Sequence, residues 1–213
     1  MYFFPACNNG SNSVIVKDSD SAKMKIRKYD TIANKLNTGK MKSDDSIEIA
    51  INNMNTSIKS MKLNGNTDID FANIMIEYHR GAVDMSLQEV KSGTDAGMKG
   101  LAKEIIRNQM DEQSKIGTIA RDIKYLKING GNNDELPQKI SGLKSKIDSI
   151  NLTQNIDKDY VNLMIKHHEI EIEIAKYEFS QGTNIQLRQM AQQIVATQTK
   201  EMSLFKKWLF ISK

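Results

Sequence analysis

The chain has 213 residues, a formal net charge of +4 at pH 7, and ordinary fractions of hydrophobic (39%) and charged (26%) residues. These values exclude a disordered chain and allow one large or two small domains with a buried core. The charge is mild and the few aromatic residues do not alternate with a basic stripe, so we expect no nucleic-acid partner.

The first 17 residues are a predicted leader and tether that contains the only cysteine. Cys7 follows the small residue Ala6 and precedes a polar run over residues 8–13. This resembles the end of a bacterial lipoprotein signal with Cys7 as the lipid attachment site, although Pro5 is unusual there. Either the natural leader starts before Met1 or the match is chance. We expect a lipid-anchored protein of the periplasm or cell envelope; a cytoplasmic protein with an ordinary thiol is the alternative.

Residues 18–44 form a predicted N-terminal helical segment, and an internal duplication follows it. When the chain is shifted by 89 residues, long stretches align without a gap; for example, Asp68, His79 and Glu112 fall on Asp157, His168 and Glu201. The first repeat spans residues 45–128, the second spans residues 134–213, and an Asn/Gly-rich linker over residues 129–133 joins them. Such self-similarity indicates two copies of one structural unit.

Each repeat is predicted to contain three helices, over residues 45–62, 68–92 and 95–127 and over residues 135–150, 157–181 and 184–211. Gly93 and Gly182 end the middle helices, and Thr94 and Thr183 are predicted to cap the helices that follow. The fold class is therefore all-α: two tandem three-helix units that form a helical bundle, preceded by the N-terminal segment.

Polar residues interrupt the apolar stripes of these helices. Glu112 lies between Ile105 and Ile116 in the first repeat, and Glu201 takes the matching place in the second. A glutamate on a core-facing stripe is costly unless it is paired or bound to a cation. On the middle helices, Met75 and His79 are one turn apart, and Met164 and His168 repeat this pair. The second repeat adds His167 and Glu171 to the same patch.

Two interpretations of these residues stay open. One is a metal site between the middle and last helices, and its imidazole and thioether donors suit copper. The other is a buried hydrogen-bond network without metal. We favour the network in the first repeat and the metal site in the second. The candidate ligands are Met164, His167, His168, Glu171 and Glu201, with Met75, His79 and Glu112 in the weaker first site.

Residues 70–85, 102–106 and 109–112, with residues 164–168 and 198–201, resemble the signature of the domain of unknown function 305 family. The resemblance covers about residues 45–211. It implies a ferritin-like helical fold, frequent export or lipid anchoring in bacteria and, in some members, copper binding and copper tolerance. The chain departs from the family at Tyr78, which stands where the first of two adjacent histidines belongs, and at Ile174, which replaces a methionine.

We therefore expect an exported metal-binding protein, with copper as the metal, that serves in metal buffering or tolerance. A metal-free helical module for protein interaction or envelope scaffolding is the alternative. No phosphate loop and no nucleophile with a base at helical spacing occurs, so we expect no enzyme. The sequence leaves a homo-oligomer open.

Overall fold

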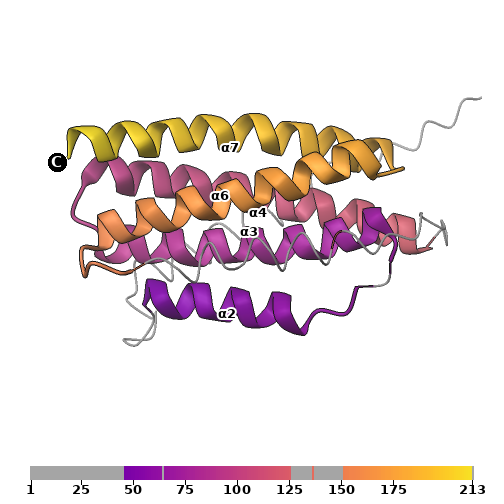
Figure 1. Ribbon diagram of the computed structural model, residues 1–213, viewed down its shortest axis with the longest axis horizontal. Helices are drawn as coiled ribbons and strands as arrows, with labels where there is room; N and C mark the ends of the chain where they lie inside the picture. The colour runs from indigo at the N-terminus through magenta and orange to yellow at the C-terminus, as the bar shows by residue number, and fades with distance from the viewer. Residues whose placement is uncertain (1–45, 64, 126–135, 137–150, 213) are drawn as a thin grey trace, which may run out of the picture. The chain divides into compact units, whose positions relative to one another are not determined.

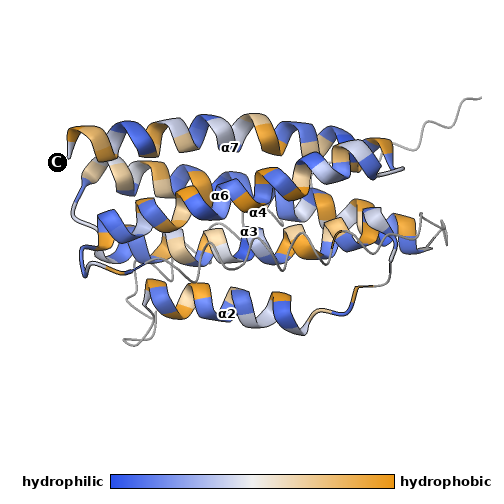
Figure 2. Ribbon diagram, in the orientation of Figure 1, coloured by the Kyte–Doolittle hydropathy of each residue, from blue (hydrophilic) through white to orange (hydrophobic). Residues whose placement is uncertain are grey.

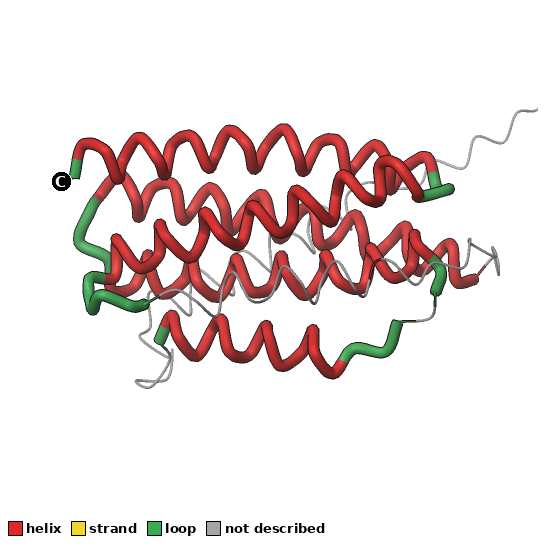
Figure 3. The backbone as a smooth tube through the Cα atoms, viewed as in Figure 1, coloured by secondary structure: helices red, strands yellow, loops and turns green. Residues whose placement is uncertain are grey.

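The structure is a computed structural model that describes residues 46–63, 65–125, 136 and 151–212 (Figure 1). Within these residues the chain forms helices joined by loops, and Figure 3 shows no strand among them. The predicted leader with Cys7, the segment 18–44, the linker 129–133 and most of the helix 135–150 lie outside the described residues. Leu136 alone is described in that last stretch, and its side chain is buried.

The described helices confirm the all-α fold class. In the first repeat they are α2 (Ile47–Ser60), α3 (Thr67–Ser92) and α4 (Ala96–Tyr125). In the second repeat they are α6 (Ile156–Gln181) and α7 (Ile185–Ile211). Both middle helices, α3 and α6, end before Gly93 and Gly182, as the sequence predicts. None of the described helices is long and apolar enough to cross a membrane.

The helices begin at short polar side chains that accept hydrogen bonds from the first turn. Asp95 Oδ1 accepts from the Met98 N–H at 2.8 Å, and Asn184 Oδ1 accepts from the Leu187 N–H at 3.0 Å. The prediction that Thr94 and Thr183 cap these helices is therefore wrong, because the next residue in each loop provides the cap. The two threonines instead bind aspartates on the opposite repeat.

The helices pack by their apolar faces into one compact unit within residues 41–213. Helix α3 contacts α2, α4 and α6, and α6 also contacts α7. In Figure 1, α3 and α6 lie side by side and run in opposite directions. Each helix alternates apolar and polar residues along its length (Figure 2), as amphipathic helices do when one face is buried. The largest fully buried side chains include Phe71, Tyr78, Tyr160 and Phe205.

Aspartates at the starts of α3 and α6 tie the two repeats together. The Asp157 carboxylate accepts hydrogen bonds from the N–H groups of Thr94 and Asp95, both at 3.0 Å. Asp68, the equivalent residue, accepts from the N–H groups of Thr183 and Asn184, both at 2.9 Å. Each middle helix thus holds the loop that precedes the last helix of the other repeat.

Candidate metal centre

All three histidines of the chain lie on the middle helices and are completely buried. His79 comes from α3, and His167 and His168 come from α6. They face the interior because α3 and α6 pack against each other and are themselves covered by α4 and α7. Buried imidazoles need polar partners, and here these are carboxylates: Glu171 contacts all three histidines, while Glu112 and Glu201 contact His79 and His168.

Glu171 of α6 lies at the centre of this cluster and is completely buried. Its carboxylate accepts hydrogen bonds from His79 Nδ1 at 2.9 Å, from His168 Nδ1 at 3.2 Å and from Gln198 Nε2 at 2.7 Å. Burial alone would raise the pKa of Glu171, but charge and hydrogen bonds from the histidines hold it well below its usual value. Glu171 is therefore the shared anion of two histidines that occupy equivalent positions in the repeats.

The other ring nitrogens of these two histidines face carboxylates on the last helices. His79 Nε2 lies 3.1 Å from Glu112 Oε2, and His168 Nε2 lies 2.9 Å from Glu201 Oε2. Within the described part of the chain, neither Nε2 atom makes a directed hydrogen bond. Burial opposes the charged form of each imidazole, but its two carboxylate neighbours outweigh this and raise the pKa of both His79 and His168 to about 9.

His167 makes no directed hydrogen bond to any described residue at either ring nitrogen. Its Nε2 lies 3.3 Å from Glu171 Oε2, and its ring centroid lies 5.3 Å from that of Tyr78. Tyr78 stands at the equivalent position in the first repeat, and burial together with the Glu171 charge raises the pKa of its hydroxyl. An imidazole of this kind has two polar ring nitrogens inside the core whose hydrogen-bonding capacity is not satisfied.

Met75 and Met164, the two thioether candidates, are also completely buried. Each precedes its histidine by one helical turn, on α3 and on α6 respectively. Both belong to the same hydrophobic core as the neighbouring aromatic residues. The predicted candidates of the two repeats thus enter one region of the interior, with the side chains of Glu112 (17% exposed) and Glu201 (8% exposed) at its margin.

The structure joins the two predicted sites into a single cluster. We expected one set of ligands in each repeat, but Glu171 of the second repeat pairs with His79 of the first. Glu171 aligns with Ala82 in the repeat, so no equivalent glutamate exists on α3. Sequence reasoning also missed the contact between Tyr78 and His167. In both contacts the two residues lie on the middle helices, and this was the only signal for them. The sequence does not show that these two helices pack against each other.

The donor chemistry fits a soft or borderline metal ion, although the donors do not converge. Among the described residues, no group of three or more His, Cys, Asp and Glu side chains is arranged to hold a metal ion. Metal-binding histidines usually donate one ring N–H to a carboxylate and use the other nitrogen as ligand. His79 and His168 have the first part of this arrangement, because Glu171 holds each Nδ1, while each Nε2 faces the carboxylate of Glu112 or Glu201.

The sequence profile of the family described as Domain of unknown function (DUF305) matches residues 17–120 and 127–209. No curated protein matches the chain. The solved structure "CopM in the Cu(II)-bound form" is 21% identical, with a TM-score of 0.50 over 66% of this chain and 95% of that chain. "CopM in the Cu(I)-bound form" is 22% identical, with a TM-score of 0.51 over 66% and 94%.

A "DUF305 fragment from Deinococcus radiodurans" is 17% identical, with a TM-score of 0.51 over 67% of this chain and 95% of that chain. At these identities the likeness establishes a shared helical fold.

Proposed function

We propose that this chain, which belongs to the family described as Domain of unknown function (DUF305), is an exported protein that binds copper for metal buffering or tolerance. It is a binding protein rather than an enzyme in this proposal. The observation that carries the proposal is the pair of buried imidazoles whose Nδ1 atoms are held by Glu171 while their Nε2 atoms face the carboxylates of Glu112 and Glu201.

The residues present supply the donors that copper prefers. His79 and His168 offer imidazole nitrogens once their protons leave, His167 is a third imidazole, and Met75 and Met164 offer soft thioether sulfur. Glu112 and Glu201 are placed to orient the imidazoles or to complete the ligand set. The names of the similar CopM structures state that those proteins were observed with Cu(I), Cu(II) and Ag, which supports a soft-ion site in this fold.

The test is a competition titration of tag-free, metal-free protein with Cu(I) and with Cu(II) against a chromogenic chelator. We compare the wild type with His79→Gln/His168→Gln and with the control Glu173→Gln, an exposed glutamate on α6 that pairs with Lys176. We expect the double variant to lose at least about tenfold in affinity while the control binds as the wild type does. Equal affinity in the double variant and the wild type contradicts the site.

A second variant separates the thioether donors from the imidazoles. Met75→Leu/Met164→Leu keeps apolar side chains of similar volume at two fully buried positions. Because thioether sulfur prefers Cu(I), we expect the affinity for Cu(I) to fall more than the affinity for Cu(II). An equal effect on both oxidation states would assign the methionines to packing alone.

A metal-free helical module is the second candidate function. The hydrogen bonds that Glu171 accepts from His79, His168 and Gln198 favour it, because they stabilise the cluster without any ion. The lack of a converged ligand group among the described residues also favours it. In that case none of the proteins titrated above binds copper, and the cluster serves to fix α3 against α6.

We also propose that the protein resides in the periplasm or cell envelope and is anchored by a lipid on Cys7. The support is the sequence around Cys7, where a small residue precedes the cysteine and a polar tether follows it. Metabolic labelling with a fatty-acid analogue in the native host tests this directly. We expect the label and the membrane association in the wild type and their loss in Cys7→Ser.

A further inference from the structure

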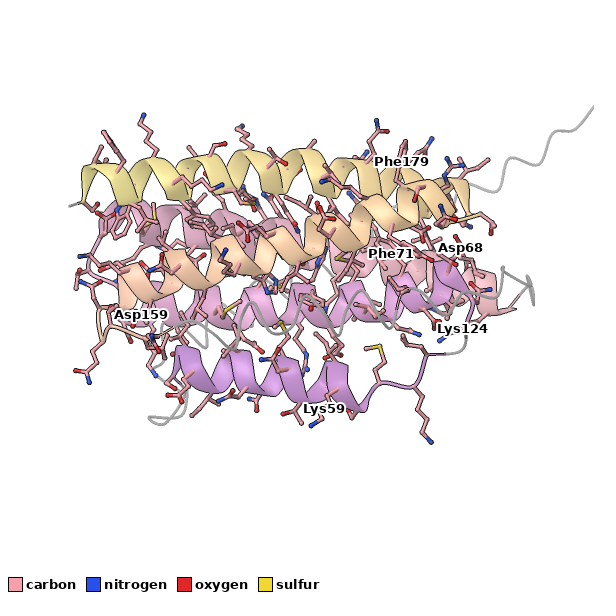
Figure 4. All side chains as sticks on the ribbon, viewed as in Figure 1. Lys59, Asp68, Phe71, Lys124, Asp159 and Phe179 are labelled. Carbon is pink, nitrogen blue, oxygen red and sulfur yellow. The ribbon has the colours of Figure 1, made fainter. Side chains whose placement is uncertain are left out.

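A glutamate–aspartate pair is buried at each end of the helical bundle. Glu89 of α3 packs over Gly93, next to Thr94, which donates to Asp157 of α6. Glu178 of α6 packs over Gly182, next to Thr183, which donates to Asp68 of α3. Each glutamate therefore faces the aspartate of the other helix, and we call Glu89–Asp157 and Glu178–Asp68 the end pairs. Both glutamates are completely buried, and Asp157 and Asp68 are only 3% and 1% exposed. Figure 4 shows Asp68 near one end of the bundle and Asp159, two residues after Asp157, near the other.

The aspartates of the end pairs already have hydrogen-bond donors. Asp157 accepts from the N–H groups of Thr94 and Asp95 and from the Thr94 hydroxyl, and Asp68 makes the equivalent contacts in the second repeat. Burial acts to raise the pKa of Asp157, but these hydrogen bonds outweigh it and lower that pKa. Donors of this kind stabilise the carboxylate form, so Asp157 is the anion of its pair, and Asp68 has the same set of donors.

The glutamates have no hydrogen-bond donor among the described residues. Neither carboxyl oxygen of Glu89 and neither of Glu178 receives a hydrogen bond from that part of the chain. Each carboxyl group is packed over the glycine that follows its helix: a Cβ atom placed on Gly93 or Gly182 would lie 2.2 Å from the glutamate Oε1. The glycines therefore allow each glutamate to lie across the helix end, where it faces the aspartate.

A buried carboxylate without a donor, placed against a second carboxylate, is strongly unfavourable. A protonated glutamate removes the repulsion and supplies the missing hydrogen, because its O–H can donate to the aspartate. We propose that each end pair holds one shared proton, with Glu89 and Glu178 as neutral acids that donate to Asp157 and Asp68, and that these protons fasten the two repeats to each other. Loss of either proton leaves two facing carboxylates and loosens that end of the bundle.

The charges around Glu89 agree with this assignment. Burial and Asp157 raise the pKa of Glu89 to about 8, and Asp95 adds to the effect while Lys99 opposes it. The Lys99 ammonium donates to the Gly93 carbonyl at 3.0 Å, so it stays beside the pair without entering it. Burial and the nearby Glu89 charge raise the pKa of the Tyr160 hydroxyl, which is hydrogen-bonded to Ser86.

The second pair has a similar surrounding. Burial and Asp68 raise the pKa of Glu178 to about 9, and Arg188 opposes this. Arg188 Nε donates to the Phe179 carbonyl at 2.9 Å, which matches the role of Lys99 in the first pair. Both glutamates thus keep their proton in the folded protein at a pH where an exposed glutamate has lost it.

The sign of the effect on stability follows from proton counts. A glutamate in the unfolded chain releases its proton near its ordinary pKa of 4.5, whereas Glu89 and Glu178 have pKa values of about 8 and about 9 in the fold. Between these values the folded protein binds more protons, so stability is lost as the pH rises through the folded pKa values. Each pair should raise the unfolding equilibrium constant by up to about tenfold per pH unit in this range.

The experiment measures urea unfolding of the full metal-free chain from about pH 6 to about pH 9. Glu89→Gln/Glu178→Gln carries amides that donate to the aspartates without titrating, and the control Glu104→Gln changes an exposed glutamate of α4. We expect the unfolding equilibrium constant of the wild type to rise with pH by up to about a hundredfold more per pH unit than that of the double variant. The control should keep the wild-type profile. Histidine titration contributes equally to all three proteins and cancels in the comparison.

Isotope-edited infrared spectroscopy of the folded wild type at neutral pH provides the second readout. We expect the carbonyl band of protonated glutamic acid in the wild type and in the control, and its absence from the double variant. Identical pH profiles in the double variant and the wild type overturn the proposal, and so does a wild type with no protonated carboxyl band. The infrared result decides the question even if the double variant does not fold.

Discussion

Replacement of Glu171 by glutamine should destabilise the metal-free protein more than most other single changes on α6. Glu171→Gln keeps the shape of the side chain but removes the negative charge that His79 and His168 share. It also turns an amide NH₂ group toward the Gln198 amide donor, which now bonds to Glu171 at 2.7 Å. The site is completely buried, so water cannot replace the lost partner.

The expected loss follows from the contacts that disappear. Removing one partner of a buried ion pair costs about 3–5 kcal/mol, because the remaining charge stays in the interior without compensation. Part of this cost is recovered when the histidines release their protons, so we place the loss near 3 kcal/mol, which corresponds roughly to a 6–12 °C fall in Tm for a domain of this size.

The assay is equilibrium urea unfolding followed by far-UV circular dichroism in the presence of a chelator. Glu173→Gln is the control, since Glu173 lies two residues away on α6 and makes an exposed ion pair with Lys176. Such a pair is worth less than about 1 kcal/mol. If Glu171→Gln costs no more than Glu173→Gln, the cluster does not stabilise the fold and our assignment of Glu171 as its central anion is refuted.

Three further changes test the packing. Gly93→Ala should destabilise the fold by about 1–3 kcal/mol, because its Cβ would lie 2.6 Å from the Glu89 carbonyl oxygen. Chemical denaturation measures this loss. Gly100→Ala should instead stabilise by about 0.5–1 kcal/mol, because beyond its chain neighbours and the helix's own backbone no described atom lies within 4 Å of the added methyl. An unchanged or lower Tm would contradict this. Ser86→Ala removes the 2.9 Å hydrogen bond to the buried Tyr160 hydroxyl and should cost about 1–3 kcal/mol; a loss near zero would mean that another group satisfies the tyrosine.

The sequence alone determined the helices and their class. Amphipathic periodicity, the glycines after α3 and α6, and the alignment at an offset of 89 residues predicted where the described helices lie. These signals are local or repeat within the chain, so they need no knowledge of which helices touch. The same patterns identified Glu112, which is half-buried, and Glu201, which is buried, as polar exceptions on apolar stripes.

The identity of the partners was decided by the tertiary structure. The sequence assigned His79 and His168 to separate sites, but the antiparallel packing of α3 on α6 places both against Glu171. The threonines predicted as caps bind Asp68 and Asp157 of the opposite repeat for the same reason.

Periodicity shows that a side chain faces inward but not which helix it meets, since that depends on how two apolar faces fit together. The central anion and the end pairs are therefore properties of the interface between the repeats, which neither repeat contains alone.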